Sequence, residues 1–219
     1  MTCRMMAEFG VSVEEEEEAV FTVPRGQVYR GREYSVEGDA SSASYFLAAA
    51  AITGGRMTVR NVGDASIQGD AEFRQVLERM GAKVRSGPDW IEVSGSLARG
   101  IKIDLNRMPD MVPTLAVTAL FAPGRTVIAN VANLRYKESD RLKAVTTEMK
   151  KIGGRVEELP DGLVIEGGEL HGAEIETYDD HRIAMAFALA GLKIPGIRIK
   201  NPECVAKTFP GFFDAFLSL

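Results

Sequence analysis

Apolar residues along this chain alternate between helix-like spacing and short runs typical of strands. Between Phe73 and Met80 the apolar side chains fall at i, i+3, i+4 and i+7, which places them on one helix face. Similar segments, many of them ended by glycine, predict helices at residues 1–10, 38–52, 73–80, 111–122, 142–152, 183–192 and 212–219. Runs rich in β-branched residues predict strands at 11–13, 20–23, 57–61, 83–85, 90–93, 126–130, 155–157, 163–166 and 196–200.

The predicted elements recur with a period of about 71 residues. Asp39, Asp110 and His181 each stand near the start of a helix, and both intervals between them are 71 residues. Spacing this regular indicates an internal repeat with the order βαβαββ or a close permutation, so the predicted fold class is α/β (α+β). The predicted parts are a tail of a preceding unit with a linker at 1–37, and a lobe at 38–219 with units at about 38–107, 108–177 and 178–219.

The third unit differs from the two before it because it stops inside its second helix and has no closing hairpin. The sequence therefore predicts a fragment of a larger protein. We expect the hairpin at residues 11–23 to take the missing place, within the chain or by exchange in a dimer, because an unpaired sheet edge favours association. The five glutamates at 14–18 are expected to form the solvated turn of this hairpin.

Composition limits the possible functions. A formal net charge of -5 argues against a general nucleic-acid binder, which needs a positive face. Cys3 and Cys204 have no metal-ligand spacing, so neither a zinc site nor a disulfide framework is predicted, and a reducing cytoplasm fits. The longest apolar run, residues 45–52, is far shorter than the roughly 20 residues of a membrane-spanning helix, and no signal-peptide pattern is present.

Candidate chemistry is densest in the segment NLRYKESDR, residues 133–141, which lies between two apolar runs. Its five charges must face solvent or a ligand. Cationic donors next to acidic acceptors suit an anionic substrate that also exchanges protons. The alternative is a solvated loop leading into a helix, with Ser139 or Asp140 as the N-cap.

Further candidates recur at equivalent positions of the repeat units. These are Asp110, His181, Arg182 and Lys207. Each alone could be an ordinary capping or surface residue. Because they occupy equivalent places in the units, we expect them at one end of a set of parallel helices, where converging N-termini favour anions.

Five motifs, in this order along the chain, resemble those of the 3-phosphoshikimate 1-carboxyvinyltransferase (EPSP synthase) family. The motifs are GDASSASYF (38–46), MPDMVPT (108–114), KESDR (137–141), YDDHR (178–182) and AKTFP (206–210). Members of this family are two-lobed and about twice as long, and this chain resembles the C-terminal lobe preceded by the end of the N-terminal lobe. The resemblance implies three βαβαββ units per lobe, with helices inside and sheets outside.

The resemblance implies transfer of the enolpyruvyl group of phosphoenolpyruvate to the 5-hydroxyl of shikimate 3-phosphate, with release of phosphate and without a metal or organic cofactor. Asp110 then matches the base that takes the hydroxyl proton, and Glu138 the acid that protonates the phosphoenolpyruvate carbon. The implied ligands of phosphoenolpyruvate are Arg141, Arg182 and Lys207, with His181 beside them. Those of shikimate 3-phosphate are Asn133 and Lys137.

Departures from the family pattern leave alternatives open. Val112-Pro113 replaces smaller or unbranched residues. The lysine, arginine, serine and glycine-rich motifs of the N-terminal lobe have no counterpart, so we expect weak binding and negligible turnover by the isolated chain, and a complementary lobe or a swapped homodimer as partner. One alternative is the related UDP-N-acetylglucosamine enolpyruvyl transferase, although KESDR and DHR favour the shikimate branch. The other is a non-catalytic module that dimerises or pairs with a separate lobe.

Overall fold

The second repeat unit contains every expected element. The computed structural model describes residues 1–16 and 20–219. In chain order the unit comprises β6 (Lys102–Asp104), α4 (Val112–Ala119), β7 (Arg125–Ala129), α5 (Arg141–Lys151), β8 (Arg155–Leu159) and β9 (Gly162–Glu166). Its sheet has the order β6-β7-β9-β8, with β6 parallel to β7 and the other pairs antiparallel. The predicted order βαβαββ is thus confirmed for this unit, although its first strand, β6, lies before the expected start at about residue 108.

The first and third units contain parts of the same pattern. The first has α2 (Ala40–Thr53), β3 (Arg56–Arg60), α3 (Phe73–Arg79), β4 (Lys83–Gly87) and β5 (Trp90–Ser94), with an antiparallel sheet of order β3-β5-β4. The third has β10 (Glu174–Ile175), α6 (His181–Gly191), β11 (Arg198–Ile199) and α7 (Phe212–Leu217). Its two strands are parallel and, within the described residues, pair only with each other.

One asparagine marks the same backbone position in each unit. Asn61, Asn130 and Asn201 follow β3, β7 and β11 and have left-handed φ values of 62°, 62° and 50°. Asparagine is among the few residues that adopt this conformation readily. Each side-chain amide donates to the segment that leads into its unit's first helix: to Val36 O, Asp104 Oδ2 and Asp179 Oδ1, respectively. The three units therefore share this turn as well as their common elements.

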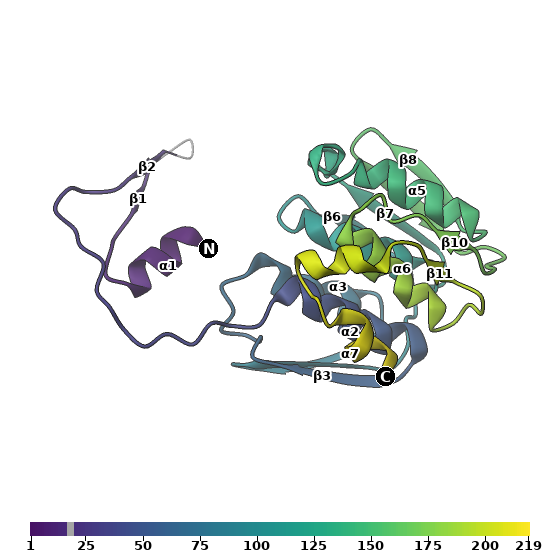
Figure 1. The fold of residues 1–219 in the computed structure, drawn as a ribbon, viewed down its shortest axis with the longest axis horizontal. Coiled ribbons are helices and arrows are strands. Elements are labelled where there is room, and N and C mark those ends of the chain that lie inside the picture. The colour runs from purple at the N-terminus through teal and green to yellow at the C-terminus, as the bar shows by residue number, and fades with distance from the viewer. Residues whose placement is uncertain (17–19) are drawn as a thin grey trace.

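The helices α2, α4 and α6 form the interior of the lobe and contact one another. All residues of α4 are buried, and α6 is buried apart from Arg182 and Gly191. A helix that is apolar on every side needs such an interior position. Alanines dominate α2, which allows its neighbours to approach closely. The sheets lie outside these helices, as expected (Figure 1).

The start of α2 depends on the side chain of Asp39, which accepts hydrogen bonds from the backbone amides of Ser41 and Ser42. We expect Asp39→Ala to lower the free energy of unfolding by about 1 kcal/mol, because these amides lose their acceptor. Urea denaturation measures the change. Asp39→Asn, which keeps an acceptor oxygen, is the control and should be nearly neutral; equal losses in both variants would contradict the capping role.

The N-terminal segment forms a separate small structure beside the lobe (Figure 1). It contains α1 (Thr2–Glu8), β1 (Glu14–Glu15) and β2 (Phe21–Thr22), and the two strands pair with each other. The strand predicted at 11–13 was wrong, because Val11 instead closes the helix by donating to Met6 O at 3.0 Å. The acidic turn predicted at 14–18 was wrong for Glu14 and Glu15, which form β1, and its residues 17 and 18 lie outside the described residues.

The prediction that this hairpin completes the third unit within the chain was wrong. β1 and β2 form their own two-stranded sheet, and β10 and β11 form another. The base of the hairpin is closed by Gln27, which accepts from Ser12 N and donates to Ser12 O. Among the described residues, no helix is both long and apolar enough to cross a membrane.

Candidate active site

Arg141, the first residue of α5, is the centre of the candidate site. Its side chain is 1% exposed and contacts three carboxylates. The guanidinium donates to Asp110 Oδ1 at 2.9 Å, Glu138 Oε2 at 2.6 Å and Asp180 Oδ2 at 2.8 Å. A buried charge is tolerated only when it is paired and hydrogen-bonded, so these contacts fix the relative positions of the three acids.

Asp180 is the most deeply buried of these acids, and sequence reasoning did not select it. It caps α6 by accepting from the amide of Arg182 and also accepts from Ser139 Oγ, both at 3.0 Å. Its side chain is 0% exposed. The second aspartate of YDDHR, at an N-cap position immediately before the selected His-Arg pair, was the signal that could have revealed it.

The turn that leads into Asp180 is strained. Tyr178 and Asp179 have φ values of 54° and 56°, a conformation that non-glycine residues rarely adopt. The hydroxyl of Tyr178 donates to Glu148 Oε1 at 2.8 Å, and Glu148 Oε2 accepts from Lys151 and from the amide of Glu176. Glu148 is fully buried on α5, so these bonds hold the strained turn against the helix that carries Arg141.

Asp110 lies in the short helical turn η3 (Pro109–Met111), directly before α4, and is surrounded by cations. It pairs with Arg141 at 2.9 Å, Arg182 at 3.1 Å and Lys137 at 3.4 Å. Burial acts to raise its pKa, but the positive charges of Arg182, Arg141 and Lys137 outweigh burial, and the pKa lies below its ordinary value. Asp110 is therefore an ionised hydrogen-bond acceptor at neutral pH.

Glu138 occupies the more open side of the cluster. Its Oε1 accepts from Lys207 Nζ at 2.6 Å, while Oε2 accepts from Arg141. The hydrogen bond from Lys207 is the largest cause that lowers the pKa of Glu138, to about 2, and Arg141 contributes to it. Lys207 is 54% exposed, so this side of the cluster is accessible to a ligand from solvent.

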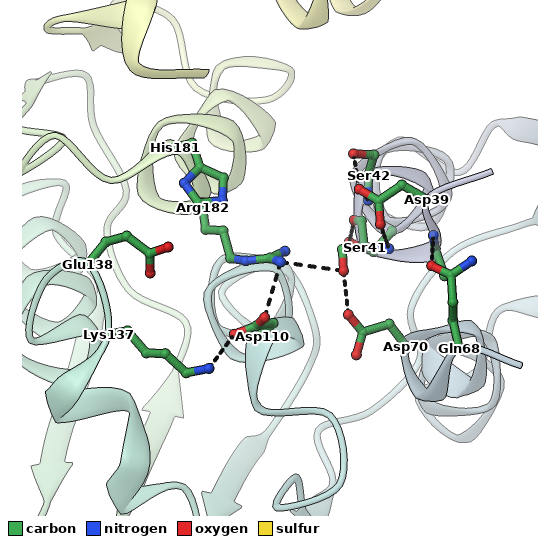
Figure 2. Close-up of polar contacts among 12 residues, drawn as sticks. Asp39, Ser41, Ser42, Gln68, Asp70, Asp110, Lys137, Glu138, His181 and Arg182 are labelled. Atoms are coloured by element: carbon green, nitrogen blue, oxygen red, sulfur yellow. Dashed lines mark hydrogen bonds and ion pairs between the residues drawn. The ribbon is translucent and has the colours of Figure 1, made fainter. Parts of the chain in front are cut away.

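His181 lies beside the cluster with little exposed surface. Its Nδ1 is 3.7 Å from Asp180 Oδ1, and burial followed by the charge of Arg182 lowers its pKa. The imidazole is therefore neutral at pH 7. Figure 2 shows His181 and Arg182 at the start of one helix, with Asp110 and Lys137 across from them. Within the described residues, Nδ1 of His181 is a buried polar atom without a hydrogen-bond partner.

Two members of the segment 133–141 lie away from the cluster. Asn133 is exposed on η4 (Ala132–Tyr136), outside the ion-pair network of the described residues. Arg135 turns toward the β8–β9 hairpin, where it pairs with Glu158 at 2.7 Å and with Asp140 at 3.1 Å. Asp140 in turn caps α5, as the capping alternative predicted. Arg135 and Asp140 therefore anchor the segment, while Lys137, Glu138 and Arg141 belong to the ion-pair cluster.

The structure brings most of the selected residues into one network. Its members are Asp110, Lys137, Glu138, Arg141, Arg182 and Lys207. Two acids held among four cations can bind a multiply charged anion and exchange protons with it. Within residues 1–16 and 20–219, no group of three or more potential ligands is arranged to hold a metal ion.

Comparisons with known proteins show the family of the chain. The family model for EPSP synthase (3-phosphoshikimate 1-carboxyvinyltransferase) matches residues 1–216. The chain is 52% identical over 220 residues to a 3-phosphoshikimate 1-carboxyvinyltransferase of Nostoc punctiforme, covering 100% of this chain and 52% of the relative. A relative of the same name from Yersinia pseudotuberculosis is 50% identical over 221 residues, with the same coverage.

Solved structures extend the likeness to the fold. EPSP synthase from Acinetobacter baumannii superimposes with a TM-score of 0.81 at 34% identity, covering 96% of this chain and 52% of that one. The enolpyruvyl transferase NikO from Streptomyces tendae shares the fold with a TM-score of 0.77 at 19% identity, covering 99% of this chain and 51% of that one. The repeat units and the cluster at their helix starts thus define a lobe of the enolpyruvyl-transferase fold.

The sequence comparisons identify one family among the proteins that share this fold. The chain belongs to the EPSP synthase (3-phosphoshikimate 1-carboxyvinyltransferase) family. It spans about half the length of the curated relatives that it matches.

Proposed function

We propose that this chain supplies one half of an active site that transfers the enolpyruvyl group of phosphoenolpyruvate to the 5-hydroxyl of shikimate 3-phosphate and releases phosphate. The observation that carries the proposal is the arrangement around Arg141, which holds Asp110 and Glu138 in one cluster with Arg182 and Lys207 nearby. Family membership supports the choice of reaction over other acid–base chemistry. The relatives' name favours the shikimate branch over the UDP-N-acetylglucosamine branch.

The two carboxylates take opposite parts in this proposal. Asp110 accepts the proton of the attacking hydroxyl, for which its ionised state is required. Glu138 delivers a proton to the methylene carbon of phosphoenolpyruvate, so it must first become protonated. Both acids are fixed by the same guanidinium, which sets their separation without direct contact between them.

The resemblance to the EPSP synthase family assigns the cations to the two substrates. Arg141, Arg182 and Lys207 hold phosphoenolpyruvate, because planar guanidinium groups suit carboxylate and phosphate oxygens and Lys207 faces solvent. His181 lies next to that group and offers a neutral ring nitrogen. Asn133 and Lys137 contact shikimate 3-phosphate on the exposed side of the segment. No cofactor takes part in the proposed reaction.

The proposed organisation divides the chain into the segment 1–37 and the lobe 38–219, with units at about 38–107, 108–177 and 178–219, acting in the cytoplasm. Within the segment 1–37, α1 has no buried residue. An N-terminal lobe that covers this helix and faces Lys207 is the proposed partner. A homodimer that exchanges the hairpin is the alternative, and the mass of the purified protein in solution distinguishes the two.

A reconstitution experiment tests the proposed function. The chain is mixed with the separately expressed N-terminal half of the Nostoc punctiforme relative, and phosphate release from phosphoenolpyruvate and shikimate 3-phosphate is followed. We expect negligible release by the chain alone, because half of the donors are missing, and sustained release by the mixture. UDP-N-acetylglucosamine as acceptor is the specificity control. Phosphate release only with UDP-N-acetylglucosamine would overturn the proposal. So would a mixture that forms a stable complex but releases no phosphate with shikimate 3-phosphate.

A further inference from the structure

Asp70 is a further carboxylate near Arg182, and it has no part in the proposed reaction. Asp70 belongs to η2 (Gly69–Glu72) of the first unit, whereas Arg182 begins the helix of the third. Ser41 connects them: its hydroxyl donates to Asp70 Oδ2 and accepts from Arg182 Nη2 at 3.5 Å. The same Nη2 donates to Asp110 Oδ2 at 3.1 Å, so one guanidinium nitrogen is shared between the two sides (Figure 2).

The direction of these hydrogen bonds follows from the groups involved. An ionised carboxylate can only accept, so the single proton of the Ser41 hydroxyl points to Asp70. The lone pairs of Ser41 are then directed away from Asp70 and available to Arg182. Without Asp70 the hydroxyl could rotate and place its proton elsewhere, which would remove the fixed acceptor for Arg182.

The position of Asp70 is set independently of Arg182. Gln68, two residues earlier, accepts from the amide of Ala40 at 3.0 Å and donates to the carbonyl of Gly38 at 2.7 Å. These bonds fasten η2 to the start of α2, where Asp39 is the cap. Ser41 is buried in the same place. The pair Ser41 and Asp70 is therefore a rigid support rather than a mobile surface contact.

The charges of Asp70 and Arg182 also favour the contact of both residues with Ser41. Burial is the largest influence on the pKa of Asp70 and raises it, while the Ser41 bond and the charge of Arg182 oppose this effect. The negative charge of Asp70 therefore depends on its neighbours. Arg182, which is 13% exposed, has Asp110 on one side and the Ser41–Asp70 pair on the other.

We propose that Asp70 is a positioning residue that acts through Ser41 to hold the guanidinium of Arg182 in the orientation required for the anionic substrate. All three repeat units then contribute to the site: the first orients Arg182, the second provides Asp110 and the third carries Arg182 itself. This inference rests on the proposed function for its catalytic meaning. The restricted rotation of the Arg182 guanidinium, however, can be measured without enzyme turnover.

The first test uses the chain by itself and follows the guanidinium group of Arg182 by nuclear magnetic resonance. The signal is assigned by its loss in Arg182→Lys. We expect rotation of the guanidinium to be several-fold faster in Asp70→Asn and in Ser41→Ala than in the unmodified chain. The matched control is Glu72→Gln on the same helical turn, 48% exposed and 3.7 Å from Arg74, which should leave the rotation unchanged. Unchanged rotation in both site variants, with folding retained, would overturn the inference.

The second test uses the reconstituted two-lobe assembly. We expect Asp70→Asn to raise the KM for phosphoenolpyruvate by on the order of tenfold while kcat changes less, because a binding cation is disordered. In an Arg182→Lys background the same substitution should have little further effect, since the group that it orients is gone. Additive losses would show a purely structural role and overturn the inference. Absent turnover by the unmodified assembly would contradict the proposed function alone, since the rotation measurement still decides the role of Asp70.

Discussion

Replacing Arg141 with alanine is expected to lower the free energy of unfolding by about 3–5 kcal/mol, the largest loss of stability that a single substitution in this site should cause. The substitution removes the donor of three ion pairs, and Asp180 is left fully buried beside a cavity where the guanidinium was. Ser139 and the amide of Arg182 still bond Asp180, but they do not neutralise it. Urea denaturation of the chain and its variant measures the difference.

The control for this prediction is Lys137→Ala. Lys137 also pairs with Asp110, at 3.4 Å, but its side chain is 33% exposed and water can replace it. We expect a loss below about 1 kcal/mol for this variant. A similar, small loss for Arg141→Ala would show that the buried cluster does not stabilise the lobe. The double variant Arg141→Ala with Asp180→Ala should lose less than the two single losses added together.

Acid should act on the same ion pairs. The pKa of Glu138 is lowered to about 2 from an ordinary 4.5, and that of Asp110 is also lowered. A carboxyl group whose pKa is lowered by folding stabilises the native state fully above its unfolded pKa, and this contribution is lost as the pH falls through the folded value. The unmodified chain should therefore lose this stability between about pH 4.5 and pH 2, and Arg141→Ala should lose less over that interval.

The repeat was the feature most securely predicted from sequence, because it depends on spacing rather than on the boundaries of any element. Asp39, Asp110 and His181 recur every 71 residues, and the structure places them at the N-cap of α2, in the turn η3 before α4 and at the first residue of α6. Strands β6 and β10 were not predicted. They have three and two residues and pair in parallel with strands that follow a helix, so local alternation carries little signal for them.

The network of the site was only partly predictable. The segment 133–141 indicated a concentration of charge, but sequence cannot show that Arg135 turns to Glu158 while Arg141 is buried among three acids. Those directions depend on the register of the β8–β9 hairpin and on the approach of α6. Ser41 and Asp70 were missed for the same reason: the hydrogen bond from Arg182 to Ser41 spans 141 residues along the chain, and Asp70 is connected to Arg182 only through Ser41.

Glu138→Gln in the reconstituted two-lobe assembly is expected to lower kcat by about a hundredfold to ten thousandfold, the usual range for the loss of a general acid. Glutamine keeps an oxygen for Arg141 or Lys207 but has no acidic proton to transfer. Steady-state kinetics with phosphoenolpyruvate as the varied substrate measure the change. The KM should stay similar or fall, because uncharged glutamine competes less strongly with the substrate for the two cations that the carboxylate otherwise occupies.

Glu158→Gln is the matched control, since Glu158 pairs with Arg135 outside the cluster and should leave kcat unchanged. A kcat within a fewfold of normal for Glu138→Gln would contradict the assignment of Glu138 as the acid. Asp110→Asn should cause a loss of similar size, because the hydroxyl proton would lose its acceptor.

The pH dependence of kcat tests how Glu138 gains the proton that it donates. With its pKa near 2 it holds no proton at neutral pH, and the Lys207 hydrogen bond is the main cause. A substrate whose anionic groups engage Lys207 and Arg141 withdraws both influences, so the pKa of Glu138 should rise when phosphoenolpyruvate binds. Because protonated Glu138 is the active form, kcat should fall as the pH rises through this raised pKa. In Glu138→Gln that decrease should be absent, and a decrease at the same pH in the variant would assign the proton to another group.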